Sequence, residues 1–231
     1  MSISPLIIAP DHEQFVEDAA ALIAAAIRGA IDERDRCTIA LSGGSTPGPV
    51  YTRLAGLPNI DWSKVIIMLA DERCVPMTSA ESTQGMIIET LIKRLPVRPL
   101  RFVVPDTRLD PEPGAEDYAL QVEDVLDVDP LDCCVLGMGD DGHIASLFPP
   151  LSELAQSALT AFHAEQEMFA VRDRISLTLP VLASARSPLL LLSGAKKKAA
   201  WDEMRASPEG QERWPFKAVL AGRKARVVAQ W

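Results

Sequence analysis

His143 is the residue of this sequence best suited to acid–base chemistry. It follows a glycine-rich segment, residues 137–142, and Asp140 and Asp141 stand just before it. An imidazole ordinarily has a pKa of about 6.5, so it can act as a base at neutral pH, and a nearby carboxylate can fix its tautomer. The same grouping could belong to a metal site, but no third or fourth ligand stands at a suitable spacing. His143 is therefore a candidate general base, with the two aspartates as candidate partners.

The segment 137–142 also has the G-x-G-x-x-G spacing of dinucleotide-binding turns. Two aspartates stand where a pyrophosphate would have to approach, and no ribose-binding acidic residue ends the next strand at the usual distance. The spacing therefore does not predict a dinucleotide site. The other two histidines, His12 and His163, lie in polar surroundings and are expected at the surface.

The turn formed by Gly43, Gly44, Ser45 and Thr46 could bind a phosphate. Glycines let backbone N–H groups approach an anion closely, hydroxyl groups add donors, and the N-terminus of the following helix favours negative charge. The Gly-Lys-Ser/Thr of a Walker loop is absent, so nucleotide hydrolysis has little support. An ordinary tight turn remains the other interpretation.

Charged residues follow two other predicted strands. Asp71, Glu72 and Arg73 place carboxylates and a guanidinium that could orient a polyol phosphate. An internal pair between arginine and carboxylate, holding the loop, is the alternative. Three lysines, residues 196–198, start a predicted helix, where they oppose the helix dipole unless an anion lies there. The alternative for these lysines is a solvated charge run.

Apolar strand-like segments alternate with amphipathic helices along the chain. The pattern predicts strands at 37–41, 65–70, 101–104, 131–137, 168–171, 189–193 and 225–229, and helices at 11–34, around Tyr51 and Leu54, and at 84–95, 115–126, 179–185 and 195–204. Such alternation predicts an α/β fold in three α/β/α layers, with a mostly parallel, Rossmann-like sheet and helices on both faces. We expect residues 1–231 to form a single domain. Four clusters follow predicted strands: the glycine turn 43–46, residues 71–73, the histidine segment 137–143 and the lysines 196–198. Because parallel sheets bind ligands beyond the carboxyl ends of their strands, these four clusters should meet at one edge.

The composition argues against several classes of partner. Lys and Arg number 23 against 32 Asp and Glu, for a formal net charge of -9, whereas nucleic-acid binding by counterion release needs a positive surface. The longest apolar stretches, 19–27 and 188–192, are far shorter than the roughly 20 residues of a membrane span. The first ten residues show no secretory pattern.

The four cysteines fit neither a disulfide framework nor a metal knuckle. We expect reduced thiols, with Cys37, Cys133 and Cys134 buried in strands and Cys74 beside charged residues. Together with the composition, this predicts a cytoplasmic protein without nucleic-acid or membrane partners.

Five segments together resemble a known family. They are residues 41–47 (LSGGSTP), 70–76 (ADERCVP), 136–149 (LGMGDDGHIASLFP), 174–180 (RISLTLP) and 193–197 (SGAKK). In this order the chain resembles 6-phosphogluconolactonases, in the superfamily that also holds glucosamine-6-phosphate deaminases. The deaminases typically have Tyr after the Asp-Glu pair and an Asn-Glu-Pro stretch after the histidine segment. Arg73 and residues 145–149 (ASLFP) replace them here, which favours the lactonase.

Two positions depart from the family pattern. Thr83 stands where the lactonases usually have Asn after Ser, and the C-terminal residues 226–231 lack the usual closing Asp. Either change could alter the fit of the substrate without removing the chemistry.

The resemblance implies hydrolysis of 6-phospho-D-glucono-1,5-lactone to 6-phosphogluconate in the oxidative pentose phosphate pathway, with no cofactor and no metal. It gives His143 the role of general base and Asp141, or else Asp140, the task of orienting the imidazole. Backbone N–H groups of Gly43 and Gly44 are candidates for stabilising the oxyanion. The implied substrate-binding side chains are Ser45, Thr46, Asp71, Arg73, Arg174 and Lys197, of which Arg73 and Lys197 would hold the phosphate.

Two other functions stay open. An amino-sugar phosphate deaminase or isomerase on the same fold would release ammonia from glucosamine 6-phosphate. A non-catalytic sugar-phosphate sensor would bind 6-phosphogluconate without turnover, although the acidic chain shows no spare segment for a DNA-binding module. The sequence predicts neither the oligomeric state nor the discrimination among phosphorylated lactones.

Overall fold

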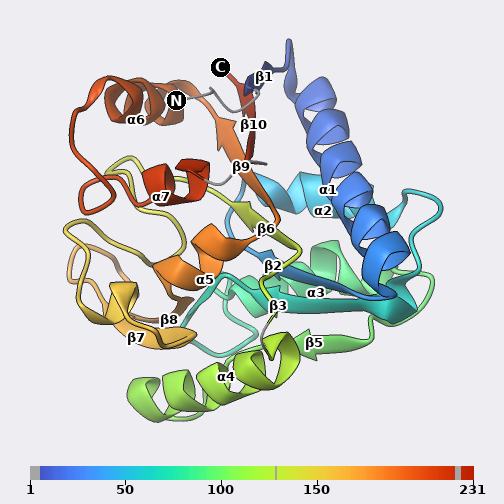
Figure 1. The fold of residues 1–231 in the computed structure, drawn as a ribbon, viewed down its shortest axis with the longest axis horizontal. Coiled ribbons are helices and arrows are strands. Elements are labelled where there is room, and N and C mark those ends of the chain that lie inside the picture. The colour runs from blue at the N-terminus through green and yellow to red at the C-terminus, as the bar shows by residue number, and fades with distance from the viewer. Residues whose placement is uncertain (1–5, 128, 222–224) are drawn as a thin grey trace.

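A seven-stranded parallel sheet forms the centre of the protein (Figure 1). The computed structural model describes residues 6–127, 129–221 and 225–231. The strand order is β1-β10-β9-β6-β2-β3-β5, and every neighbouring pair is parallel. After β2 the chain adds β3 and β5 on one side and then returns to β6 on the other, so the order reverses between β2 and β6. The strands are β1 (Leu6–Ile8), β2 (Cys37–Leu41), β3 (Val65–Leu69), β5 (Arg101–Val103), β6 (Cys133–Leu136), β9 (Ser187–Ser193) and β10 (Arg226–Gln230).

Helices cover both faces of this sheet, which confirms the predicted three-layer α/β/α fold. In one hydrophobic cluster, helices α1, α2 and α3 pack against the sheet face that carries Ile39 and Ile67. In the second, the four helices from α4 through α7 pack against the face that carries Ala40 and Met68. Neighbouring residues fall in different clusters because successive strand side chains point to opposite faces. The helices are α1 (His12–Arg34), α2 (Pro47–Ala55), α3 (Thr83–Thr90), α4 (Pro111–Leu126), α5 (Leu179–Ser184), α6 (Ala195–Ala206) and α7 (Phe216–Ala221).

The first long helix forms as its sequence predicts. The Asp11 side chain accepts a hydrogen bond of 2.8 Å from the backbone N–H of Gln14, which satisfies a free donor of the first turn. Apolar side chains at helical spacing, including Phe15, Ile23 and Ile27, are fully buried. None of the described helices is long and apolar enough to cross a membrane.

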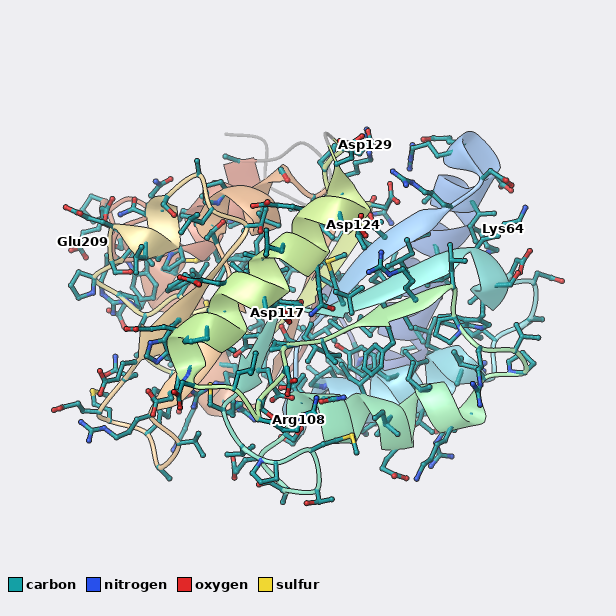
Figure 2. The ribbon with its side chains drawn as sticks, turned by 90° about the horizontal axis from the view of Figure 1, so that it is seen from below. Lys64, Arg108, Asp117, Asp124, Asp129 and Glu209 are labelled. Carbon is teal, nitrogen blue, oxygen red and sulfur yellow. The ribbon has the colours of Figure 1, made fainter. Side chains whose placement is uncertain are left out.

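The helix α4 lies across the outside of the molecule, over the sheet, when the protein is seen from below (Figure 2). Asp117 and Asp124 are carried by this helix. An ion pair of 2.6 Å between Asp124 and Arg101 joins the helix to β5. Both of these side chains are largely exposed, so the contact adds little to stability and the helix is held by its buried apolar side.

A second sheet of three antiparallel strands was not predicted. It contains β4 (Asp71–Arg73), β8 (Asp173–Leu177) and β7 (Ala161–Glu165), with β8 in the middle. The predicted strand at 168–171 is wrong, because these residues form the turn that joins β7 to β8, and Met168 is 77% exposed. A short apolar run by itself does not distinguish a strand from a loop, and here the pairing of β7 with β8 requires a connection at this position.

Some predicted boundaries also shift. The helix predicted at 84–95 is divided into α3 and a 3-10 turn, Ile92–Arg94, because Leu91 leaves the helical region at φ -123° and ψ -69°. The helix predicted at 115–126 starts earlier, at Pro111, where proline suits the first turn because its missing N–H has no helical partner. Two other short elements, β1 and α7, were missed because each has too few residues to show a period.

Candidate active site

The four predicted clusters meet at one cavity beyond the carboxyl ends of the parallel strands, as expected. The cavity has a volume of about 220 Å³ and lies where the strand order reverses between β2 and β6. Of the ten predicted site residues, only Asp141 does not line it. The lining residues are Ser42, Gly43, Gly44, Ser45, Thr46, Pro47, Asp71, Arg73, Gly137, Met138, Gly139, His143, Ala145, Arg174, Leu191 and Lys197.

His143, which lines the cavity, forms a close pair with Asp141, which does not. Nδ1 of His143 lies 2.5 Å from Oδ1 of Asp141, and the same oxygen accepts a hydrogen bond of 3.2 Å from the His143 backbone N–H. Burial raises the pKa of the Asp141 carboxyl, but the hydrogen bond and charge of His143 outweigh burial and hold that pKa below its usual value. An ionised Asp141 makes Nδ1 the protonated nitrogen, so Nε2 is left as the proton acceptor.

The loop that carries this pair can hold it only because two positions are glycine. A Cβ atom on Gly139 would lie 2.1 Å from Nδ1 of His143 and 2.4 Å from Oδ1 of Asp141. Gly142 has φ +91°, and a Cβ atom there would lie 2.5 Å from the Trp214 ring. Because it has no side chain, Gly139 leaves room for the His143 imidazole, and Gly142 leaves room for the Trp214 ring.

Arg213 is a contributor to this loop that the sequence analysis missed. Its Nη1 donates a hydrogen bond of 2.7 Å to the carbonyl oxygen of Asp141, and its guanidinium lies 3.8 Å from the ring centre of Trp214. Arg213 thus fixes the backbone of Asp141, although it stands 72 residues further along the chain. No local pattern in the sequence points to such a contact.

Asp140 does not share the role of Asp141. Its carboxylate lies 2.9 Å from Nζ of Lys197, which reaches the cavity from the first turn of α6. Lys197 is thereby placed beside the histidine loop, as the convergence of the clusters predicts. The prediction that Asp140 orients the imidazole is not supported, because its carboxylate pairs with Lys197.

Arg73 and Arg174 bring two positive charges together in the site. They are partners in the antiparallel ladder between β4 and β8. Arg73 donates from Nη1 to the carbonyl oxygen of Glu81 at 2.7 Å, and the Glu81 carboxylate is 3.9 Å away. Burial and the charge of Arg73 lower the pKa of Arg174, although a guanidinium stays protonated in proteins. Among the residues that the structure describes, the buried Nε atoms of both arginines find no hydrogen-bond partner, which suits an anion-binding site.

Asp71 is held in place by the segment that follows His143. Its Oδ2 accepts a hydrogen bond of 2.8 Å from the Ser146 hydroxyl, and its side chain is 6% exposed. On β4, Asp71 and Arg73 are two residues apart and therefore point to the same face, toward the cavity. The structure thus places a fixed carboxylate beside the two arginines.

Glu72 points away from the cavity and anchors the strand to α3. Its buried carboxylate accepts hydrogen bonds from the backbone N–H groups of Arg73, Thr83 and Gln84, each at 2.7 Å, and from Ser82. Burial raises its pKa, and these four hydrogen bonds only partly oppose the rise. Thr83 is brought directly under the glycine turn, since a Cβ atom on Gly43 would lie 2.4 Å from the Thr83 hydroxyl.

The remaining histidines and cysteines lie outside the cavity. His12 is exposed, as expected, but His163 is not a free surface residue, because its Nε2 lies 2.9 Å from Asp173 on the neighbouring strand. The partial burial follows from the unpredicted pairing of β7 with β8. Cys37, Cys133 and Cys134 are buried as predicted. Within the described ranges, no group of three or more histidine, cysteine or acidic side chains could hold a metal ion.

Comparison with known proteins relates this site to others. A family profile described as glucosamine-6-phosphate isomerases/6-phosphogluconolactonase matches residues 10–229. A 6-phosphogluconolactonase of Neisseria meningitidis is 34% identical over 222 residues, which cover 91% of this chain and 92% of that protein. The crystal structure of a 6-phosphogluconolactonase from Shewanella baltica covers 100% of this chain and 98% of its own, with a TM-score of 0.85 and 28% identity. For the Thermotoga maritima 6-phosphogluconolactonase, 98% of each chain is covered at a TM-score of 0.84 and 26% identity. The present chain belongs to the family of glucosamine-6-phosphate isomerases and 6-phosphogluconolactonases.

Proposed function

We propose that this chain hydrolyses 6-phospho-D-glucono-1,5-lactone to 6-phosphogluconate, the reaction that the names of its relatives indicate. The observation that carries the proposal is that His143, paired with Asp141, lines one cavity together with Arg73 and the buried Arg174. A base is needed to activate water, and cationic side chains are needed to hold a phosphorylated substrate. The side chains of the site supply both.

His143 is the general base of the proposed mechanism. Its Nε2 takes a proton from water as the water oxygen attacks the lactone carbonyl carbon, while Asp141 stabilises the imidazolium through Nδ1. When the tetrahedral intermediate collapses, the bond between the carbonyl carbon and the ring oxygen breaks, and His143 returns its proton to that oxygen, which becomes a hydroxyl group. The acid product then loses a proton to solvent. Proton transfer of this kind contributes about 10² to 10⁴ in rate.

The other cavity residues bind the substrate. Arg73, Arg174 and Lys197 hold the phosphate, and Ser45 and Thr46 add hydroxyl donors. The phosphate charge would compete with Asp140 for Lys197.

Groups near the base complete the proposed site. Asp71, fixed by Ser146, orients hydroxyl groups of the sugar. Backbone N–H groups of Gly43 and Gly44 stabilise the oxyanion that forms on the carbonyl oxygen. We further propose that residues 1–231 form one catalytic domain that works in the cytoplasm. The four cysteines are unpaired in the structure, and they would stay reduced in that compartment.

The proposal is tested by hydrolysis of freshly generated lactone at neutral pH and low buffer concentration, with a blank because the lactone also opens spontaneously. The wild type should exceed the blank, and His143→Ala should reduce kcat by about two decades or more, with little change in product binding. Asp141→Asn should also lower kcat, because the imidazole loses the partner that fixes its tautomer. His12→Ala is the matched control, since His12 is exposed and lies outside the cavity.

Near-normal turnover by His143→Ala would contradict the role of the base. If the wild type does not exceed the blank, ammonia release from glucosamine 6-phosphate tests the deaminase alternative, which would take precedence if that assay is positive. Tight binding of 6-phosphogluconate without either activity would instead identify a sugar-phosphate sensor.

A further inference from the structure

Phe169 turns inward from the tip of the hairpin between β7 and β8. The connection spans residues 166–172 and is closed by a hydrogen bond of 3.1 Å from the Gln166 N–H to the Arg172 carbonyl. Met168 and Ala170, on either side of Phe169, are exposed, whereas the Phe169 side chain is partly buried. The tip of this hairpin therefore inserts one aromatic ring toward the site.

The Phe169 ring contacts both functional parts of the site. Its centroid lies 5.7 Å from that of His143, in an edge-to-face arrangement, and 5.3 Å from that of Phe148. The guanidinium carbon of Arg174 lies 4.8 Å from the centroid of Phe169 and 5.6 Å from that of Phe148. Neither phenyl ring lines the cavity. Phe169 thus stands behind the residues that would touch the substrate.

The Arg174 guanidinium lies against these two rings. Arg174 is 6% exposed, and no described residue forms a hydrogen bond with its Nε. Across the described part of the chain, no carboxylate forms an ion pair with it, and its partner in the ladder is the like-charged Arg73. A guanidinium over aromatic faces is attracted by the ring quadrupoles, more strongly where water is excluded. The two rings therefore contact a charged group that burial and Arg73 disfavour, although the nearby carboxylates of Asp71, Glu81 and Glu72 favour it.

We propose that Phe169 is a positioning residue that holds Arg174 for the anionic group of the substrate and fixes the plane of the His143 ring. This inference rests on the proposed function, because it assigns the anion to Arg174 and the proton transfer to His143. Loss of the ring leaves Arg174 free to reorient beside Arg73. The anion is then bound more weakly, and a smaller loss in kcat follows from greater freedom of the imidazole.

The first test uses three substitutions at Phe169. Phe169→Ala should raise KM and the Kd of 6-phosphogluconate, measured by calorimetry, by about 3- to 30-fold, the range of one desolvated cation–π contact. Phe169→Leu, which keeps apolar bulk without a ring, should show most of this loss, and Phe169→Tyr should restore binding to near the wild-type value. Met168→Ala, next to it on the same turn but exposed, is the matched control. Unchanged affinity in both Phe169→Ala and Phe169→Leu would overturn the proposal.

The second test separates positioning from a general structural effect. In an Arg174→Met background, Phe169→Ala should weaken 6-phosphogluconate binding no further, because the group that it positions is gone. The same loss in both backgrounds would overturn the proposal. Calorimetry with the product does not depend on turnover. A wild type without lactonase activity would therefore contradict the proposed function, whereas normal activity with additive losses would contradict only the role of Phe169.

Discussion

Arg73 and Arg174 lie directly opposite each other on the antiparallel strands β4 and β8. Like charges at opposed strand positions destabilise a sheet, and here burial and mutual repulsion lower the pKa of Arg174. This destabilising pair of like charges lies at the edge of the cavity that Lys197 also lines. An anion bound between these cations would relieve the repulsion, so the arrangement links ligand binding to stability.

We predict that inorganic phosphate stabilises the wild type more than Arg174→Met. At 100 times the Kd, a ligand that binds only the folded state contributes about 2.7 kcal/mol, which corresponds to a Tm increase of roughly 5 to 10 °C for a chain of this size. Thermal unfolding with phosphate, against sodium chloride at equal ionic strength, measures the gain. An equal gain in Arg174→Met would show that the phosphate binds elsewhere.

Asp140→Asn is expected to strengthen product binding. The substitution releases Lys197 from its 2.9 Å ion pair, so that the full lysine charge faces the phosphate. Because both side chains are partly exposed, we expect a decrease in the Kd of 6-phosphogluconate of no more than about fivefold, and a smaller decrease at high salt. Asp202→Asn is the control, since Asp202 pairs with the neighbouring Lys198. A weaker affinity in Asp140→Asn would indicate that this carboxylate positions the lysine instead.

Gly139→Ala is expected to lower kcat by about 10² or more, the contribution of a positioned base. The new methyl group would occupy the space between Nδ1 of His143 and Oδ1 of Asp141. Gly29→Ala in α1 provides the control, because a Cβ atom there would meet no described heavy atom within 4 Å apart from its own neighbours and helix backbone. Lactone hydrolysis and thermal unfolding are measured for both variants. Wild-type kcat in Gly139→Ala would show that the pair does not need its present geometry.

Cys74 should react slowly with iodoacetamide at neutral pH. Burial, together with the charges of Asp173 and Glu72, raises the pKa of its thiol to about 11. At pH 7.5 only about 0.03% is then the reactive thiolate, so the rate should increase about tenfold per pH unit up to about pH 10. Mass spectrometry of alkylated peptides gives the rate, with glutathione as an unperturbed thiol. A plateau near pH 8.5 would contradict the raised pKa.

The sequence alone determined the layered fold and the place of the site. Continuous apolar strands alternating with amphipathic helices leave a parallel sheet covered on both faces as the expected arrangement. Because such strands all end at the same edge, the glycine turn after β2, the histidine loop after β6 and Lys197 after β9 had to meet. These conclusions depend on local periodicity and on one general rule of sheet geometry.

The tertiary structure alone decided which side chains pair within that site. The small antiparallel sheet sets Arg73 against Arg174, whose positions are 101 apart in the sequence (174 minus 73). The contact of Arg213 with the Asp141 carbonyl likewise joins distant segments, and Asp140 turns to Lys197 although it adjoins Asp141.

Phe169 gives the clearest contrast, because the sequence suggests a strand where the chain makes a turn that brings this ring against both Arg174 and His143. Strand register, loop closure and the packing of remote segments fix such contacts. They leave no period in the local sequence, since they arise only when the whole chain has folded.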